Sequence, residues 1–277
     1  MDKVFKIEGN QIIATLCGDP AHPPVFLIHG WTLHRGVWAT TIRALEGKYY
    51  CIAPDLLGHG DSDKPADGDY SLESQARRIF KLADQLGISR FSLIGHSMGG
   101  QIALYIASNL APDRVEKMVS VGGVVTGQLS EMIMEGSMKF IQNGRKWPAT
   151  YDLWRALVNF GPLMRLVFRP WFFDMNCMPL KTWEADRLMV FNRACAIPYD
   201  EAVKSILATN LVKYLPEIKC PVLLIYGEND GTVPVEQAIL AQSTIPNNQL
   251  VLIKSCGHFP MYEKPAEYLK ALALMFP

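Results

Sequence analysis

Ser97 is the residue of this chain best placed for nucleophilic chemistry. It lies between a short apolar run, Phe91–Ile94, which is typical of a buried parallel strand, and an apolar helix-forming segment, Gln101–Ala107. Gly95 and Gly99 stand two residues away on either side, and such small neighbours allow the chain to turn sharply. A serine on so sharp a strand-to-helix turn is exposed at the helix N-terminus. The pattern around Ser97 predicts that this serine is a nucleophile. The alternative is that Ser97 only caps the helix.

A serine hydroxyl needs a neighbouring imidazole to accept its proton, and the imidazole needs a carboxylate to orient it. Asp230 and His258 lie in the loops that follow the last two apolar runs of the chain. Because the carboxyl ends of parallel strands meet at one edge of a sheet, we expect both side chains to converge on Ser97. Glu228 is a rival carboxylate two residues before Asp230.

Other potentially reactive residues are spaced less informatively. His29, His59 and His96 do not follow H-E-x-x-H or a comparable ligand spacing, so we expect no metal site and no cofactor. The six cysteines contain no C-x-x-C pair, and we expect free, mostly buried thiols: Cys17, Cys51, Cys177, Cys195, Cys220 and Cys256.

The composition excludes several classes of partner. The 277 residues are 49% hydrophobic, which is ample for a large core, and the 27 basic residues are balanced by 27 acidic ones. That balance argues against a nucleic-acid partner and a polybasic membrane anchor. The first residues do not resemble a secretory leader, and no apolar run approaches the roughly 18 residues of a membrane span. We expect a cytoplasmic protein, either a monomer or a homodimer.

The elements that must position these residues follow an alternating order. Gly9-Asn10 separates two alternating segments at the start of the chain and predicts an antiparallel hairpin. Strand-like and helix-like segments then alternate, which favours right-handed crossovers and a mostly parallel sheet with helices on both faces. With the hairpin, about eight strands are expected, the interior ones at Val25–Ile28, Tyr49–Ala53, Phe91–Ile94, Val115–Val121, Cys220–Tyr226 and Gln249–Ile253.

The alternation is interrupted between residues 124 and 215, where no strand-like run occurs. We therefore expect residues 1–123 and 216–277 to form an α/β core and residues 124–215 to form an inserted helical cap. Large apolar residues are frequent in this insert and suit an adaptable apolar pocket as well as a local core. They are Met132, Met134, Met138, Phe140, Trp147, Trp154, Phe160, Met164, Trp171, Phe172, Phe173 and Trp183.

Over nearly its whole length the chain resembles the capped α/β-hydrolases. The resemblance rests on five motifs: His29-Gly30-Trp31, the loop 55–65 (DLLGHGDSDKP), Gly95–Gly100, Gly227–Asp230 with Val233-Pro234, and Gly257-His258. It implies a triad of Ser97, Asp230 and His258 and an oxyanion hole formed by the backbone N–H groups of Trp31 and Met98. It also implies structural roles for His29 and His96. To the substrate pocket we assign His96, Trp147, Trp154, Val233 and Phe259.

The nucleophile decides which reaction is expected. Haloalkane dehalogenases and epoxide hydrolases, which the loop 55–65 also resembles, need a carboxylate nucleophile, whereas Ser97 suits attack on a carbonyl carbon. The expected activity is hydrolysis of carboxylic esters with apolar, short-to-medium acyl or alkyl groups. Carbon–carbon hydrolysis of ring-cleavage diketones, lactone or thioester hydrolysis and cofactor-free perhydrolysis use the same groups. A hydrolase-fold receptor for a small apolar ligand is the alternative outside catalysis.

Overall fold

The structure is a computed structural model that describes residues 1–139, 153, 156, 161–177 and 192–277. Its centre is one eight-stranded sheet with the order β1-β2-β4-β3-β5-β6-β7-β8. The strands β1, β2 and β4 pair antiparallel, and every other pair is parallel. The strands are β1 (Asp2–Ile7), β2 (Asn10–Cys17), β3 (Pro24–Ile28), β4 (Tyr50–Pro54), β5 (Phe91–His96), β6 (Val115–Val121), β7 (Val222–Gly227) and β8 (Asn248–Ile253).

Helices cover both faces of this sheet, and the side chains of the interior strands alternate between two cores. In β3, Phe26 and Ile28 belong to one core, whereas Val25 and Leu27 belong to the other. Side chains of α2, α3 and α9 complete the first core, and those of α1 and α11 complete the second. The helices of this part are η1 (Arg35–Trp38), α1 (Ala39–Leu45), α2 (Leu72–Gln85), α3 (Met98–Tyr105), η2 (Ile106–Leu110), α9 (Glu236–Thr244), α10 (Pro260–Glu263) and α11 (Pro265–Leu272).

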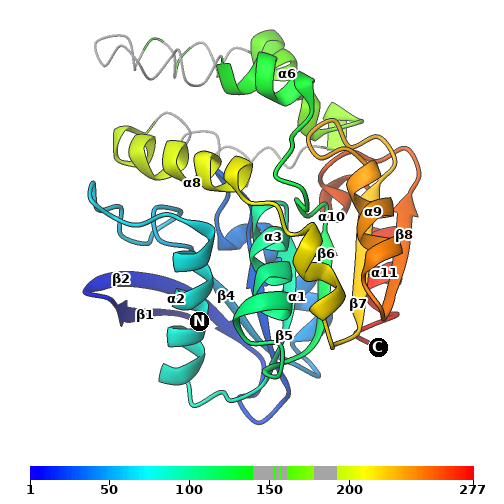
Figure 1. The fold of residues 1–277 in the computed structure, drawn as a ribbon. Helices are drawn as coiled ribbons and strands as arrows, with labels where there is room; N and C mark the ends of the chain where they lie inside the picture. The colour runs from blue at the N-terminus through cyan, green and yellow to red at the C-terminus, as the bar shows by residue number, and fades with distance from the viewer. Residues whose placement is uncertain (140–152, 154–155, 157–160, 178–191) are drawn as a thin grey trace.

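The described residues between 124 and 215 contain helices and no strand. We call this range the insert. Figure 1 shows α6 and α8 above the body of the chain, beyond one end of the sheet. Its elements are η3 (Met132–Met138), α6 (Gly161–Phe168), η5 (Arg169–Trp171), η6 (Met175–Cys177), η7 (Arg193–Cys195), α8 (Ala196–Ala208) and the start of η8 (Val212–Glu217).

Most of the expected elements are present. The hairpin turns at Glu8 and Gly9, both with positive φ. Helix α2 is capped by Ser71, whose Oγ accepts a hydrogen bond from the N–H of Ser74 at 3.2 Å. All six cysteines are free thiols. In the described part of the chain, no helix combines the length and the apolarity needed to cross a bilayer.

Candidate active site

Ser97 lies at the junction between β5 and α3, and the local glycines explain why the chain can turn there. Its backbone has φ 54° and ψ −117°, a conformation that is strained for a residue with a side chain. A Cβ on Gly95 would lie 2.2 Å from the carbonyl oxygen of Gly99, and one on Gly99 would lie 2.0 Å from that of Ile28. Glycine is therefore required on both sides of Ser97. The turn is fixed by a 2.9 Å hydrogen bond from the Ser97 N–H to the Val121 carbonyl.

Asp230 and His258 form a buried pair. The Nδ1 atom of His258 lies 2.7 Å from Oδ2 of Asp230, and both side chains are almost completely excluded from solvent. The other carboxylate oxygen, Oδ1, accepts the N–H groups of Thr232 and Val233 at 2.8 and 2.9 Å. These bonds hold the carboxylate in place beside the imidazole. The exposed Glu228, the rival in the sequence, does not contact His258.

A glycine at the end of β6 makes room for this pair. Gly122 has φ 53°, and a Cβ there would lie 3.0 Å from Nδ1 of His258 and 3.3 Å from Oδ2 of Asp230. Any larger residue would push against both partners of the hydrogen bond. Gly122 belongs to none of the five motifs, although its place directly after the carboxyl end of a strand is a usable signal.

The loop that carries His258 is held from two sides through its backbone. The N–H of His258 donates to the carbonyl of Trp171 in the insert at 2.9 Å, and the carbonyl of His258 accepts the Nε2–H of His96 at 2.8 Å. Burial lowers the pKa of His96 well below its usual value, so the ring is neutral when it makes this bond. His96 therefore contributes to the position of His258.

Glu263 fixes the same loop through its side chain. Its Oε1 accepts the N–H of Gly257 at 2.9 Å, and its Oε2 accepts those of Phe173 and Asp174 at 2.9 and 3.0 Å. Burial raises the pKa of this carboxyl, and the backbone hydrogen bonds oppose that rise. One carboxylate thus joins the His258 loop to the insert. Nothing in the one-dimensional pattern distinguished it from other glutamates.

Ser97 and His258 both line a small cavity of about 20 Å³. We call it the Ser97 cavity. His96 and Phe259, which we assigned to the pocket, lie in its wall together with Trp31, whose N–H we assigned to the oxyanion hole; Val233 lies outside that lining and donates its N–H to Asp230. Trp147 and Trp154 lie outside the described residues. Trp171, one of the large apolar insert residues expected to suit a pocket or a local core, also lies in the wall. The rest of the wall was not assigned from the sequence and consists of Leu33, Val124, Leu129, Ile133, Val203, Ile206 and Thr232.

Signals for part of this wall were present. Val124 and Leu129 follow the carboxyl end of β6, and Val203 and Ile206 are three residues apart, so they share one face of α8. Which face of an inserted helix turns toward the sheet depends on long-range packing, and short motifs do not contain that information.

The two backbone groups assigned to the oxyanion hole are available for a ligand. Neither the N–H of Trp31 nor that of Met98 donates to an acceptor within the described residues. The Trp31 ring is fixed by a 2.9 Å hydrogen bond from Nε1 to the Tyr199 carbonyl on α8. Ser97 Oγ and the His258 ring make no direct hydrogen bond in this part of the chain. This contact commonly tightens only when substrate binds.

His29 has a structural environment. Its Nε2 accepts the N–H of Leu56 at 3.0 Å, so Nδ1 carries the proton and donates to the Gly30 carbonyl at 2.8 Å. Burial lowers the pKa of His29 to about 4, which keeps the ring neutral. The neutral ring links the loop that carries Trp31 to the end of β4.

An ion pair between Arg35 and Asp55 also stabilises the loop that carries Trp31. Arg35 contacts the buried carboxylate of Asp55, and its backbone N–H donates to the same carboxylate at 2.6 Å. Asp2 and Asp61 approach the Arg35 guanidinium at 2.8 Å each. Within the described part of the chain, no group of three histidine, cysteine or carboxylate side chains is arranged to hold a metal ion.

Comparisons with known proteins agree with this architecture. Residues 23–265 match the family model described as alpha/beta hydrolase fold. The chain is 30% identical over 261 residues to an uncharacterized protein of Mycobacterium tuberculosis, covering 89% of this chain and 73% of that protein. It is 28% identical over 253 residues to a pimeloyl-[acyl-carrier protein] methyl ester esterase of Nitrosomonas europaea, covering 89% and 93% of the two chains.

Among solved structures, an esterase from Exiguobacterium antarcticum superposes with a TM-score of 0.82 at 21% identity. The match covers 100% of this chain and 99% of that one. The likeness in fold, the eight-stranded sheet and the match of the family model over most of the sequence lead to one conclusion: the chain belongs to the α/β-hydrolase family.

Proposed function

We propose that this protein is a serine hydrolase that cleaves carboxylic esters with apolar acyl or alkyl groups. The observation that carries the proposal is the buried 2.7 Å contact between His258 and Asp230. His258 lines the same apolar cavity as the strained Ser97. Lipases and an ester hydrolase among the relatives support the reaction class. The substrate and the roles of the residues are the proposal.

In this proposal Ser97 Oγ attacks the ester carbonyl carbon while Nε2 of His258 accepts its proton. Asp230 stabilises the imidazolium through the 2.7 Å hydrogen bond at Nδ1. The backbone N–H groups of Trp31 and Met98 stabilise the tetrahedral oxyanion. The imidazolium then protonates the leaving alcohol, and an acyl-enzyme remains on Ser97. A water deprotonated by His258 hydrolyses this intermediate and releases the acid.

The character of the cavity favours a neutral substrate. None of the described residues in the wall of the Ser97 cavity is lysine or arginine, and most are aliphatic or aromatic. A carboxylate buried there would lack a cationic partner, which is costly. An uncharged ester or lactone is therefore preferred to a ring-cleavage diketo acid.

We further propose that the insert acts as a cap over Ser97. It contributes Ile133, Trp171 and Val203 to the cavity wall and is hydrogen-bonded to the His258 loop. A cavity of about 20 Å³ has room for one water molecule and not for an ester. Substrate entry therefore requires rearrangement of these side chains or of the insert.

The test is the initial rate of hydrolysis of p-nitrophenyl esters from acetate to palmitate. Wild type should be active on short-to-medium chains, and Ser97→Ala should lose at least about a thousandfold in kcat. Ser92→Ala is the matched control, because Ser92 is a buried serine on β5, the strand that leads to Ser97, and lies outside the cavity wall.

Turnover retained in Ser97→Ala would exclude the proposed nucleophile. If folded wild type hydrolysed no ester, an aromatic diketone assay would test carbon–carbon hydrolysis. Stoichiometric binding of an apolar ligand without turnover would instead indicate a receptor.

A further inference from the structure

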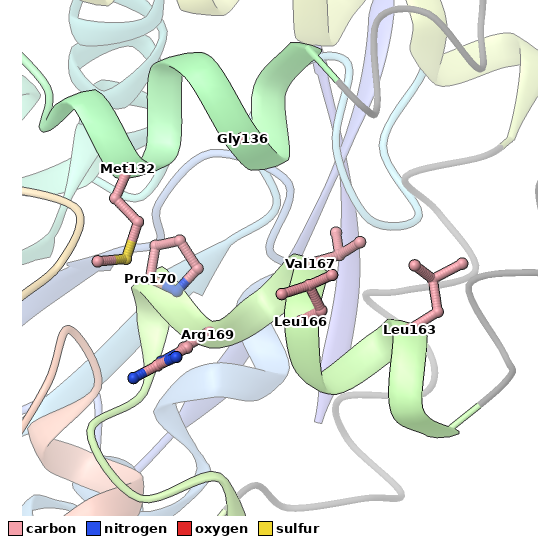
Figure 2. Close-up of a pocket in the computed structure, with 7 residues that line it drawn as sticks. All are labelled: Met132, Gly136, Leu163, Leu166, Val167, Arg169 and Pro170. Atoms are coloured by element: carbon pink, nitrogen blue, oxygen red, sulfur yellow. The ribbon is translucent and has the colours of Figure 1, made fainter.

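A second and much larger apolar space lies in the insert beside the Ser97 cavity. It has a volume of about 490 Å³ and lies between η3 on one side and α6 with η5 on the other (Figure 2). We call it the insert pocket. That volume falls within the roughly 300–1,000 Å³ typical of small-molecule sites. Its described lining is Met132, Gly136, Leu163, Leu166, Val167, Arg169 and Pro170.

The lining of the insert pocket contains apolar side chains that folding has not buried. Met132 is 54% exposed and Leu166 is 67% exposed. Apart from Arg169, no described lining residue has a polar side chain. Exposed apolar side chains grouped around a cavity favour binding of an apolar ligand, because the ligand removes their surface from water.

The insert pocket and the Ser97 cavity are adjacent, because neighbouring residues of the same two elements line them. In η3, Met132 lines the insert pocket and Ile133 lines the Ser97 cavity. In η5, Pro170 lines the insert pocket and Trp171 lines the Ser97 cavity. The elements η3 and η5 therefore border both the Ser97 cavity and the insert pocket.

We propose that the insert pocket is the binding site for the apolar acyl chain of a medium-chain ester. The chain extends from Ser97 past Ile133 and Trp171. The inference rests on the proposed function for the reaction. It adds where the acyl chain of the substrate binds and that this chain is of medium length. The Ser97 cavity cannot hold an acyl chain, and the insert pocket is the large apolar space that adjoins it among the described residues.

Gly136 offers a way to fill the pocket without disturbing its packing. A Cβ at Gly136 meets no atom within 4 Å, and the same is true of Gly47, an exposed glycine in a turn after α1. Gly136→Phe therefore places a ring in the insert pocket, and Gly47→Phe is the matched control. A second pair is Leu166→Gln in the pocket and Leu274→Gln at the C-terminus, where Leu274 is 61% exposed.

The experiment is calorimetric titration of Ser97→Ala, which cannot turn over ester by the proposed route, with methyl butanoate and methyl octanoate. Each buried methylene strengthens binding about fourfold, so the longer ester should bind up to about two-hundredfold more tightly. Adding Gly136→Phe should reduce this preference at least tenfold and leave methyl butanoate within twofold. Adding Gly47→Phe should change neither. In the enzyme that retains Ser97, the ratio of kcat/KM for p-nitrophenyl octanoate and butanoate should fall in parallel.

Several results would overturn the inference. They are equal affinity for the two methyl esters, an unchanged preference in both pocket variants, or the same loss in the control variants. The proposed function fails separately. If wild type hydrolysed no ester while the preference still depended on Gly136, the insert pocket would stand as an apolar binding site and the reaction would be wrong.

Discussion

Replacement of Glu263 by glutamine tests whether the bond between the insert and the His258 loop matters for activity. The carboxylate accepts the N–H of Gly257 at Oε1 and those of Phe173 and Asp174 at Oε2. Glutamine keeps the size of the side chain but replaces one oxygen by an NH₂ group, which cannot accept. In its better orientation the amide oxygen keeps the N–H groups of Phe173 and Asp174, and the N–H of Gly257 loses its acceptor.

The size of the effect follows from those bonds. An orphaned buried donor costs about 1–3 kcal/mol, and the two remaining hydrogen bonds lose the contribution of the charge. Removal of the buried charge recovers part of its desolvation, in keeping with the raised pKa of Glu263. We therefore expect a loss of about 2 kcal/mol in the free energy of unfolding. That corresponds to a fall of roughly 4–8 °C in Tm for a chain of this size.

Activity should fall further than stability alone explains. Gly257 directly precedes His258, and a displacement of about 1 Å at a reacting group can cost a hundredfold in rate. We expect kcat to fall about 10- to 100-fold on a p-nitrophenyl ester well below the Tm of the variant, with KM changed less than threefold. Glu267→Gln is the matched control, because Glu267 is exposed on α11. A variant within 2 °C of the wild-type Tm and within twofold of its kcat would refute the role of Glu263.

Three further changes probe the same framework. Acidification from pH 6.5 to 4 should remove about 2.5 kcal/mol of unfolding free energy through His29, because its pKa is about 4 when folded and about 6.5 when unfolded. This contribution is complete above pH 6.5, and denaturant titrations of wild type and His29→Asn at both pH values measure its loss. Gly122→Ala should lower kcat at least tenfold by displacing His258. The Tm of the variant is measured as well, so that kcat can be compared at a temperature where the variant is folded. Trp31→Phe removes the N–H donor to the Tyr199 carbonyl and should cost about 1 kcal/mol in a denaturant titration.

The sheet could be predicted from the sequence because its signals are local. Short apolar runs ended by glycine or proline gave the parallel strands, and Gly9-Asn10 gave the hairpin. The turn at Ser97 was also local, since glycine is required two residues away on either side. The choice of Asp230 as the partner of His258 came from the motif resemblance, and the 2.7 Å contact supports it.

The insert could not be predicted at the same depth. Its methionine and aromatic residues indicate apolar surface but do not say which of them faces Ser97. Trp171 lines the Ser97 cavity and Phe173 is 53% exposed, yet the two are only two residues apart in one apolar run. Glu263 was missed for a related reason, because its partners Phe173 and Asp174 are about 90 residues away along the chain.

Two of the attachments of the insert to the core also define a rule for directed evolution of substrate range. One is the set of bonds from Trp171, Phe173 and Asp174 to the His258 loop and Glu263, and the other is the bond from Trp31 to the Tyr199 carbonyl. A mutant library that randomises only the positions of η3 and α6 that line the insert pocket, while keeping these anchors and Ile133, would vary the pocket and spare the reaction centre. New specificities should therefore arise there with little loss of turnover, whereas substitutions at the anchors should yield mostly inactive clones.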